Sequence, residues 1–290
     1  MKAVSFLVSL LAYTQAATIQ PEMEGLESQE KASAQSNTCK ALVLSGGGSN
    51  GAWMAGVLYG LVNYADDPRD FEYDVVSGVS IGSIIASGLA MFEPGDEARA
   101  VSFIHSIWTH IKTSDIYQEW PLMLVSGLYR HSMYDTTPGF KTMKRLIKHF
   151  HGYKRALSLS SVDVETGQIV TLTDKNTRFG DLHKAIMASA SVPGFFPPTK
   201  LNGRLLIDGM TAWNTNAQEA IDRCREMVDD DSQITVDIII CHEDENVAKW
   251  DKSGNAWQNY WRMNDIRNRY HSTNATVGVM RAHPNINWRH

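Results

Sequence analysis

The chain has 290 residues, of which 43% are hydrophobic and 20% charged, and its formal net charge is −5. This length supports a sizeable core in one large α/β domain, or at most two domains. Nucleic-acid-binding proteins usually carry a strong basic bias, so the charge balance argues against a nucleic-acid partner.

The N-terminus has the pattern of a secretory signal peptide. Lys2 precedes an apolar run over residues 3–12, and small residues at Thr14 and Ala16 are spaced for cleavage after Ala16. The run is shorter than the about 20 apolar residues that span a bilayer, and no later segment is long and apolar enough either. We therefore expect residues 1–16 to be removed and the protein to be secreted or held in the secretory lumen. The alternative is an N-terminal helix of the mature fold.

The next segment, residues 17–38, is polar and without periodicity, which predicts a flexible lead-in to a single domain over residues 39–290. The chain contains three cysteines, so at least one has no partner within the chain. Cys39 and Cys224 are a possible disulfide that the sequence does not decide, whereas Cys241 ends an apolar run and is predicted to be a buried thiol.

The first half of this domain predicts two strand–turn–helix units. A buried strand over residues 41–44 is followed by the glycine-rich run 46–51 and a helix. A second strand over residues 73–77 is followed by a turn at Ser80 and a buried helix over residues 84–91. Two such units in succession imply a mainly parallel sheet with helices on its faces, and both turns then open at its carboxyl edge.

The rest of the chain has no internal repeat and no clear second domain. Its apolar spacing and its turn residues predict further helices and strands, and Asn274 begins a glycosylation sequon whose use stays open. The predicted helices cover residues 97–112, 139–150, 181–189 and 216–227, and the predicted strands cover 157–164, 168–173, 204–207, 234–241 and 276–280.

The turn at Ser80 matches the pattern G-x-S-x-G through Gly78 and Gly82. This pattern places a serine on a sharp turn between a strand and a helix, where its hydroxyl is exposed for nucleophilic attack. A serine hydroxyl is a poor nucleophile until a base takes its proton. The pattern also occurs by chance, so the hypothesis needs a base and an oxyanion-binding group elsewhere in the chain.

The glycine run supplies a candidate for the oxyanion-binding group. It lies between a strand and a helix, so the backbone N–H groups of Gly46, Gly47 and Gly48 are free to face an ester carbonyl attacked by the serine. Residues 46–51 also fit the dinucleotide pattern G-x-G-x-x-G, but the following strand ends without the acidic residue that pattern requires. A phosphate-binding P-loop is excluded because no Gly-Lys-Ser/Thr follows.

The base has two kinds of candidate. Among the ten histidines, His271 and His283 follow the serine in the chain order of α/β-hydrolases, but neither stands in a turn-rich setting. Asp208 directly follows an apolar strand and precedes Gly209, so it lies at a strand end, where the site is expected. An ordinary Asp-Gly turn is the alternative interpretation of these two residues.

Taken together, these motifs resemble the patatin-like phospholipase family over roughly residues 40–245. The resemblance implies a three-layer α/β/α fold, Ser80 as nucleophile, Asp208 as base, the three loop glycines as oxyanion donors, and no metal or cofactor. The matching segments are 45–51 for D-G-G-G-x-[K/R]-G, 78–82 for G-x-S-x-G, 188–193 for A-S-x-x-x-P, and 208–210 for D-G-[G/A] with Asn214 downstream.

Four positions depart from the family pattern, and none of them removes a catalytic group. Ser45 replaces the leading aspartate, and Asn50 stands where Lys or Arg is frequent. Met210 replaces a small residue beside the dyad acid, and Asn216 replaces a proline.

The resemblance implies a lipid acyl hydrolase of the phospholipase A or lysophospholipase type. The alternatives are a triacylglycerol lipase, an esterase that uses a histidine, and a catalytically silent lipid-binding or storage protein. Residues 108–134, with the apolar stretch 120–124, are expected to line an acyl groove, to form a lid or to be ordinary core. The basic side of helix 140–150 is expected either to touch an anionic membrane transiently or to face solvent. Head group, acyl length and oligomeric state stay open.

Overall fold

The computed structural model describes residues 38–121, 130–241 and 254–289 of the chain. The predicted signal peptide and nearly all of the predicted lead-in lie outside the described residues. An eight-stranded sheet has the order β10-β9-β1-β2-β5-β8-β7, with β6 paired to β5, and β3 and β4 form a separate two-stranded sheet. The strands are β1 (Cys39–Leu44), β2 (Val75–Val79), β3 (Gln118–Glu119), β4 (Tyr134–Asp135), β5 (Ala156–Asp163), β6 (Ile169–Thr173), β7 (Thr199–Leu201), β8 (Arg204–Asp208), β9 (Ile234–Ile239) and β10 (Asn287–Arg289).

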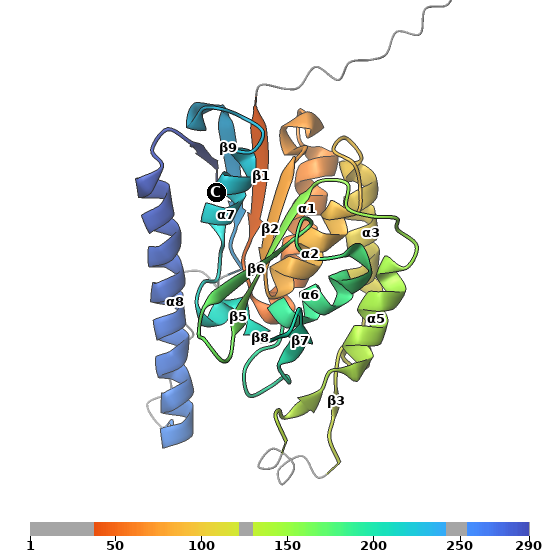
Figure 1. Ribbon diagram of the computed structural model, residues 1–290, viewed down its shortest axis with the longest axis vertical. Coiled ribbons are helices and arrows are strands. Elements are labelled where there is room, and N and C mark those ends of the chain that lie inside the picture. The colour runs from red at the N-terminus through yellow and green to blue at the C-terminus, as the bar shows by residue number, and fades with distance from the viewer. Residues whose placement is uncertain (1–37, 122–129, 242–253, 290) are drawn as a thin grey trace, which may run out of the picture. The chain divides into compact units, whose positions relative to one another are not determined.

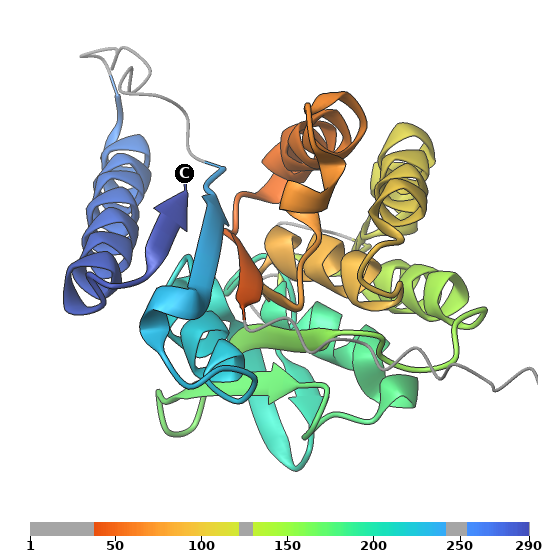
Figure 2. The same cartoon turned by 90° about the horizontal axis from the view of Figure 1, so that it is seen from above.

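Helices cover both faces of this sheet, as Figures 1 and 2 show, so the predicted three-layer α/β/α architecture is confirmed. One face carries α1 (Gly51–Tyr64), α2 (Ile81–Ala90), α3 (Glu97–His110), α5 (Thr137–Ile147) and α6 (Leu182–Ser189), and the other carries α7 (Ala217–Cys224) and α8 (Ala256–Ala282). Short 3-10 turns lie at Gly48–Asn50, Pro68–Phe71, Thr113–Asp115, Phe179–Asp181, Gly209–Thr211 and Asp231–Gln233.

The two faces of β1 show how the sequence builds these layers. Side chains alternate across a strand. Leu42 and Leu44 join the core beneath α1 and α2, whereas Ala41 and Val43 join the core beneath α7. Both cores are apolar, so β1 is a continuous hydrophobic run, as expected of a parallel strand buried on both faces. β9, β1, β2 and β5 run parallel, so the carboxyl ends of these four strands share one edge of the sheet.

The pairing along β5 brings two distant parts of the chain together at this edge. β2 runs parallel to β5 and ends with Val79 opposite Ser160. β8 runs antiparallel to β5 and ends with Asp208 opposite Ser161, the next residue along. Because β6 occupies the other side of β5 over Ser158–Val162, β2 and β8 must meet end to end on the same side. The residue after β2 and the last residue of β8 are therefore neighbours.

One predicted strand is wrong. Residues 276–280, rich in β-branched side chains, belong to the 27-residue helix α8, and the last strand is β10 instead. Thr276 and Val279 lie three residues apart, and both border the cavity between α8 and α7, so tertiary packing overrides the local strand preference. The short strands β3, β4 and β7 were not predicted. None of the helices in the described ranges is long and apolar enough to cross a membrane.

Candidate active site

Ser80 lies on a strained turn between β2 and α2. Its φ of 52° and ψ of −121° fall in a region that residues other than glycine rarely adopt. A Cβ atom on Gly78 would lie 2.4 Å from the carbonyl oxygen of Gly82, and a Cβ on Gly82 would lie 2.4 Å from that of Leu44. Both glycines are thus required for the turn to pack against itself and against β1, as the G-x-S-x-G pattern predicts.

A chain of buried serines holds the backbone of Ser80 in place. Its N–H donates to Oγ of Ser189 at 3.0 Å, and that hydroxyl donates to the carbonyl oxygen of Ser160 at 2.6 Å. The hydroxyl of Ser83 donates to the carbonyl oxygen of Ser80, also at 2.6 Å. The role of Ser189 could not be predicted from the sequence, because only the tertiary fold brings α6 beneath this turn.

Asp208, the last residue of β8, is completely buried. Its Oδ1 accepts the N–H of Met210 at 2.8 Å, whereas Oδ2 meets no donor within ordinary hydrogen-bond limits among the described residues. Burial raises the pKa of this carboxyl to about 7, although the hydroxyl of Ser80 and the amide of Met210 both act to lower that pKa. The Ser80 hydroxyl therefore lies near enough to influence the carboxyl while leaving Oδ2 without a well-formed hydrogen bond.

The glycine loop passes directly beside Ser80. A Cβ atom on Gly46 would lie 3.0 Å from Cβ of Ser80. The N–H of Gly46 already donates to the carbonyl oxygen of Asn214 at 3.1 Å, so this amide is occupied. The amides of Gly47 and Gly48 donate to no acceptor within the described part of the chain. Two of the three predicted oxyanion donors, the amides of Gly47 and Gly48, are thus available. Gly48 also has a φ of 56°, a conformation that favours glycine.

The loop is anchored from two sides. Nδ2 of Asn214 donates to the carbonyl oxygen of Gly46 at 3.2 Å, which complements the amide contact between the same two residues. The hydroxyl of Ser45 donates to that same carbonyl at 3.0 Å and accepts the N–H of Cys241 at 2.7 Å. The serine that replaces the family's aspartate therefore ties the loop to the end of β9.

Cys241 fills the space behind the loop. A Cβ atom on Gly47 would lie 2.4 Å from Cβ of Cys241, and Nδ2 of Asn50 donates to the Cys241 carbonyl oxygen at 3.5 Å. Burial raises the pKa of the Cys241 thiol to about 11, so the group stays neutral, and the prediction of a buried thiol is confirmed. Cys39 and Cys224, which the sequence left undecided, form a disulfide between β1 and α7.

Asn216, which stands in place of the family's proline, joins three elements near the site. Its Nδ2 donates to the hydroxyl of Ser160 at 2.8 Å, and its Oδ1 accepts the N–H of Glu219 and caps α7. Its carbonyl oxygen accepts the hydroxyl of Ser77 at 3.1 Å. These contacts hold α7 against β2 and β5 directly beneath the serine turn.

His283 lies away from this site. One ring nitrogen pairs with Oε1 of Gln218 at 3.0 Å, and the other lies 3.6 Å from Asp231, in the turn before β9. His283 thus lies near the amino ends of the strands, opposite the serine turn. The side chain of His271 lies outside the described residues, and so do residues 122–124 of the stretch expected to form a groove, a lid or core.

A mainly parallel sheet with a strained serine turn, a buried carboxyl and a glycine loop at its carboxyl edge is an α/β fold with the G-x-S-x-G type of strand–turn–helix. Residues 42–221 match the family described as "Patatin-like phospholipase", and the chain belongs to this family of lipid acyl hydrolases.

The chain is similar in sequence to viral and bacterial proteins. It is 29% identical over 220 residues to an uncharacterized protein of Acanthamoeba polyphaga mimivirus, a match covering 71% of this chain and 67% of that protein. It is 26% identical over 176 residues to a cGAMP-activated phospholipase of Escherichia coli (strain TW11681), covering 55% and 48%. Among solved structures, VipD from Legionella pneumophila aligns with a TM-score of 0.39 and 12% identity, covering 72% of this chain and 51% of VipD. The chain thus spans from about half to two thirds of these proteins.

Proposed function

We propose that this protein hydrolyses carboxylic esters of membrane lipids, as a phospholipase A or lysophospholipase, with Ser80 as the nucleophile and Asp208 as its base. The observation that carries the proposal is the environment of Asp208. A carboxyl with a pKa of about 7 is a far better proton acceptor at neutral pH than one near 4, and its Oδ2 is left without a strong donor beside the Ser80 hydroxyl.

In the first half-reaction, Oγ of Ser80 attacks the ester carbonyl carbon while its proton passes to Oδ2 of Asp208. The tetrahedral oxyanion accepts hydrogen bonds from the free amides of Gly47 and Gly48. When the intermediate collapses, the ester C–O bond breaks, and the leaving alcohol takes the proton from Asp208. The product is an acyl-enzyme on Ser80.

In the second half-reaction, a water molecule gives its proton to Asp208 and attacks the acyl carbon. The same two amides stabilise the second oxyanion. Collapse of this intermediate breaks the bond to Ser80 Oγ, which takes the proton back and releases the fatty acid. Both half-reactions use one base and one oxyanion site, so no histidine is needed.

The test is labelling with a fluorophosphonate probe, which captures activated serines, followed by peptide mass spectrometry. We expect one adduct on Ser80 in the wild type and none in Ser80→Ala. Asp208→Asn removes the proton acceptor while keeping the shape of the side chain, so labelling and ester turnover should fall by at least about 100-fold. His283→Ala is the matched control and should label normally.

Two results would refute the assignment. Retained labelling in Asp208→Asn would remove Asp208 from the mechanism. A complete absence of labelling in folded wild-type protein would favour the lipid-binding or storage alternative. If labelling succeeds, turnover of a phospholipid, a lysophospholipid and a triacylglycerol would then decide the substrate type.

We also propose that the protein acts in the secretory pathway. Support comes from the Cys39–Cys224 disulfide, because such bonds persist mainly in oxidising compartments. The intact mass of the protein from its native host, measured without reduction, should match a chain that begins at Ala17 and carries this disulfide. A chain that retains residues 1–16 and three free thiols would contradict the proposal.

A further inference from the structure

Helix α8 exposes an unusual number of large apolar side chains. Of the ten large hydrophobic residues that are exposed among the described residues, four lie within eleven residues of this helix. They are Tyr260, Met263, Ile266 and Tyr270, with exposed fractions of 52%, 51%, 41% and 67%. At 100° per residue their spacing places them within an arc of about 120°, which makes one continuous stripe. We call these four residues the α8 stripe.

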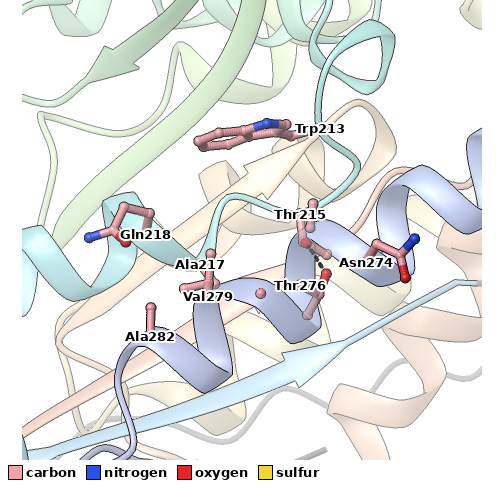
Figure 3. Close-up of a pocket in the computed structure, with 10 residues that line it drawn as sticks. Trp213, Thr215, Ala217, Gln218, Asn274, Thr276, Val279 and Ala282 are labelled. Carbon is pink, nitrogen blue, oxygen red and sulfur yellow. Dashed lines mark hydrogen bonds between the residues drawn. The ribbon is translucent and has the colours of Figure 1, made fainter.

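The C-terminal half of α8 attaches the helix to the domain at the level of the site. The hydroxyls of Thr215 and Thr276 form a hydrogen bond of 2.6 Å, which Figure 3 shows at a small cavity of about 290 Å³ between α8 and α7. Thr215 directly follows Asn214, the residue that holds the oxyanion loop. Thr276 therefore lies level with the catalytic edge of the sheet.

The stripe lies beyond this edge. After α8 the chain forms β10, which pairs with the first half of β9, so α8 runs back from the carboxyl edge toward the amino edge. At 1.5 Å per residue, Tyr270 and Tyr260 lie about 9 Å and 24 Å before Thr276 along the helix axis. Figure 1 shows the early end of α8 reaching the level of β3, past the ends of the central strands.

Other exposed apolar residues lie at the same edge, on the far side of the site. Val164 directly follows β5, and its N–H donates to the carbonyl oxygen of Leu205; both side chains are exposed. Exposed Met133 donates its N–H to the carbonyl oxygen of Gly194, in the loop that leads from α6 to β7. Exposed apolar side chains thus lie both on α8 and beyond the carboxyl end of β5.

The charge of α8 indicates what this surface contacts. Residues 256–282 contain four arginines and one acidic residue, Asp265, in a chain with a net charge of −5. Arginines interspersed with tyrosines and apolar residues are typical of the interface between water and anionic lipid. The basic helix α5 differs, because the side chains of Met143 and Ile147 on its apolar side are buried in the core.

We propose that the α8 stripe, with Met133 and Val164 across the site, docks on the surface of a bilayer that contains anionic lipids. Docking through the early end of α8 turns the carboxyl edge of the sheet, with the serine turn, toward the membrane. This inference rests on the proposed function, in which the substrate is a membrane lipid. It assigns the contact to α8 instead of the basic face of α5.

The test measures vesicle binding separately from turnover. Mature protein carrying Ser80→Ala is floated with vesicles of 70% phosphatidylcholine and 30% phosphatidylserine. The test variant adds Tyr260→Gln and Met263→Gln. The matched control adds Tyr64→Gln and Met227→Gln, which remove the same two residue types from exposed positions.

The control residues lie at the opposite edge of the sheet. Tyr64 is the last residue of α1, which runs away from the glycine loop, and Met227 contacts Cys39 at the start of β1. Each test side chain is about half exposed, so burial of the pair in lipid predicts a loss of about 10- to 100-fold in the partition coefficient. The control variant should stay within about twofold of its parent.

Three outcomes would overturn the inference: no vesicle binding by the parent, equal loss in both variants, or no loss in either. Self-association of the parent that disappears in the α8 variant, without vesicle binding, would assign the stripe to a second copy of the chain. Stripe-dependent vesicle binding without probe labelling of wild-type Ser80 would keep the docking surface and reject the hydrolase. Hydrolysis of a soluble short-chain ester without vesicle binding would keep the hydrolase and reject the docking surface.

Discussion

Replacing the buried carboxyl of Asp208, the proposed base, should make the protein more stable, and by an amount that depends on pH. In Asp208→Asn the amide keeps an oxygen for the N–H of Met210 but cannot ionise. The pKa of Asp208 rises from 3.8 to about 7 because burial disfavours the charged form. Since the folded-state pKa lies above the unfolded-state value, ionisation favours the unfolded state. The stability that this carboxyl contributes is complete below about pH 4 and is lost as the pH rises through about 7.

The size of the effect follows from the pKa shift. A shift of about three units corresponds to about 4 kcal/mol in the free energy of unfolding, which is fully lost above the folded-state pKa. At pH 5 only about 1.5–2 kcal/mol of this loss has occurred. The stability of Asp208→Asn minus that of the wild type should therefore be about 2–3 kcal/mol larger at pH 8.5 than at pH 5.

Urea unfolding of both proteins at pH 5 and pH 8.5, followed by tryptophan fluorescence, measures this difference of differences. Both proteins share the other titrating groups, so the contributions of those groups to the pH dependence of stability cancel in this comparison. Asp66→Asn is the control, because it removes the same charge from an exposed position and should show no such change. If the difference between Asp208→Asn and the wild type is independent of pH, Asp208 does not carry a raised pKa, and its role as base loses its support.

Ionisation of Asp208 should raise the activity of the protein, although it lowers the stability. Asp208 must be ionised to accept the Ser80 proton, so kcat/KM should fall about tenfold per pH unit below about pH 7 and level off above it. The pH at which activity is half-maximal should coincide with the upper end of the range in which stability is lost. A profile with its midpoint near pH 4 would contradict the burial argument.

Three further predictions concern the surroundings of the site. Ser189→Ala removes the acceptor for the nucleophile's N–H, so kcat should fall about tenfold with KM little changed, as measured on a soluble ester. Gly47→Ala places a Cβ 2.4 Å from Cys241, so probe labelling should be lost, and Cys241→Gly in the same chain should restore part of it; no restoration would refute the steric argument. Loss of the disulfide in Cys39→Ala with Cys224→Ala should lower the free energy of unfolding by about 3–5 kcal/mol in urea titrations, and an unchanged value would contradict its contribution.

The local features of the site were readable from the sequence because they depend on backbone geometry. Gly78 and Gly82 mark a turn where any side chain would strike the neighbouring backbone, and the turn at Ser80 follows from that requirement. The alternation of β1 and its neighbours between two apolar cores likewise predicts a buried parallel sheet. The residue types at these positions form short local patterns, so the order of residues alone reveals them, although Gly82 also packs against Leu44 of β1.

Contacts between distant segments were not readable in this way. The strand register along β5 makes Asp208 a neighbour of the serine turn, and burial then raises the pKa of its carboxyl. The occupied amide of Gly46 and the hydrogen bond from the Ser80 amide to Ser189 depend on segments more than 100 residues away.

Helix α8 shows most clearly the difference between what the local sequence favours and what tertiary packing decides. Its β-branched residues near Thr276 favour a strand locally, and packing against α7 decides for a helix. The sequence by itself determined the fold class, the serine turn and the glycine loop, because these follow from the conformational limits of single turns and strands. Only the tertiary structure decided which loop amides are free, how basic Asp208 is and which apolar residues face outward, because hydrogen-bond partners and burial are properties of the assembled fold.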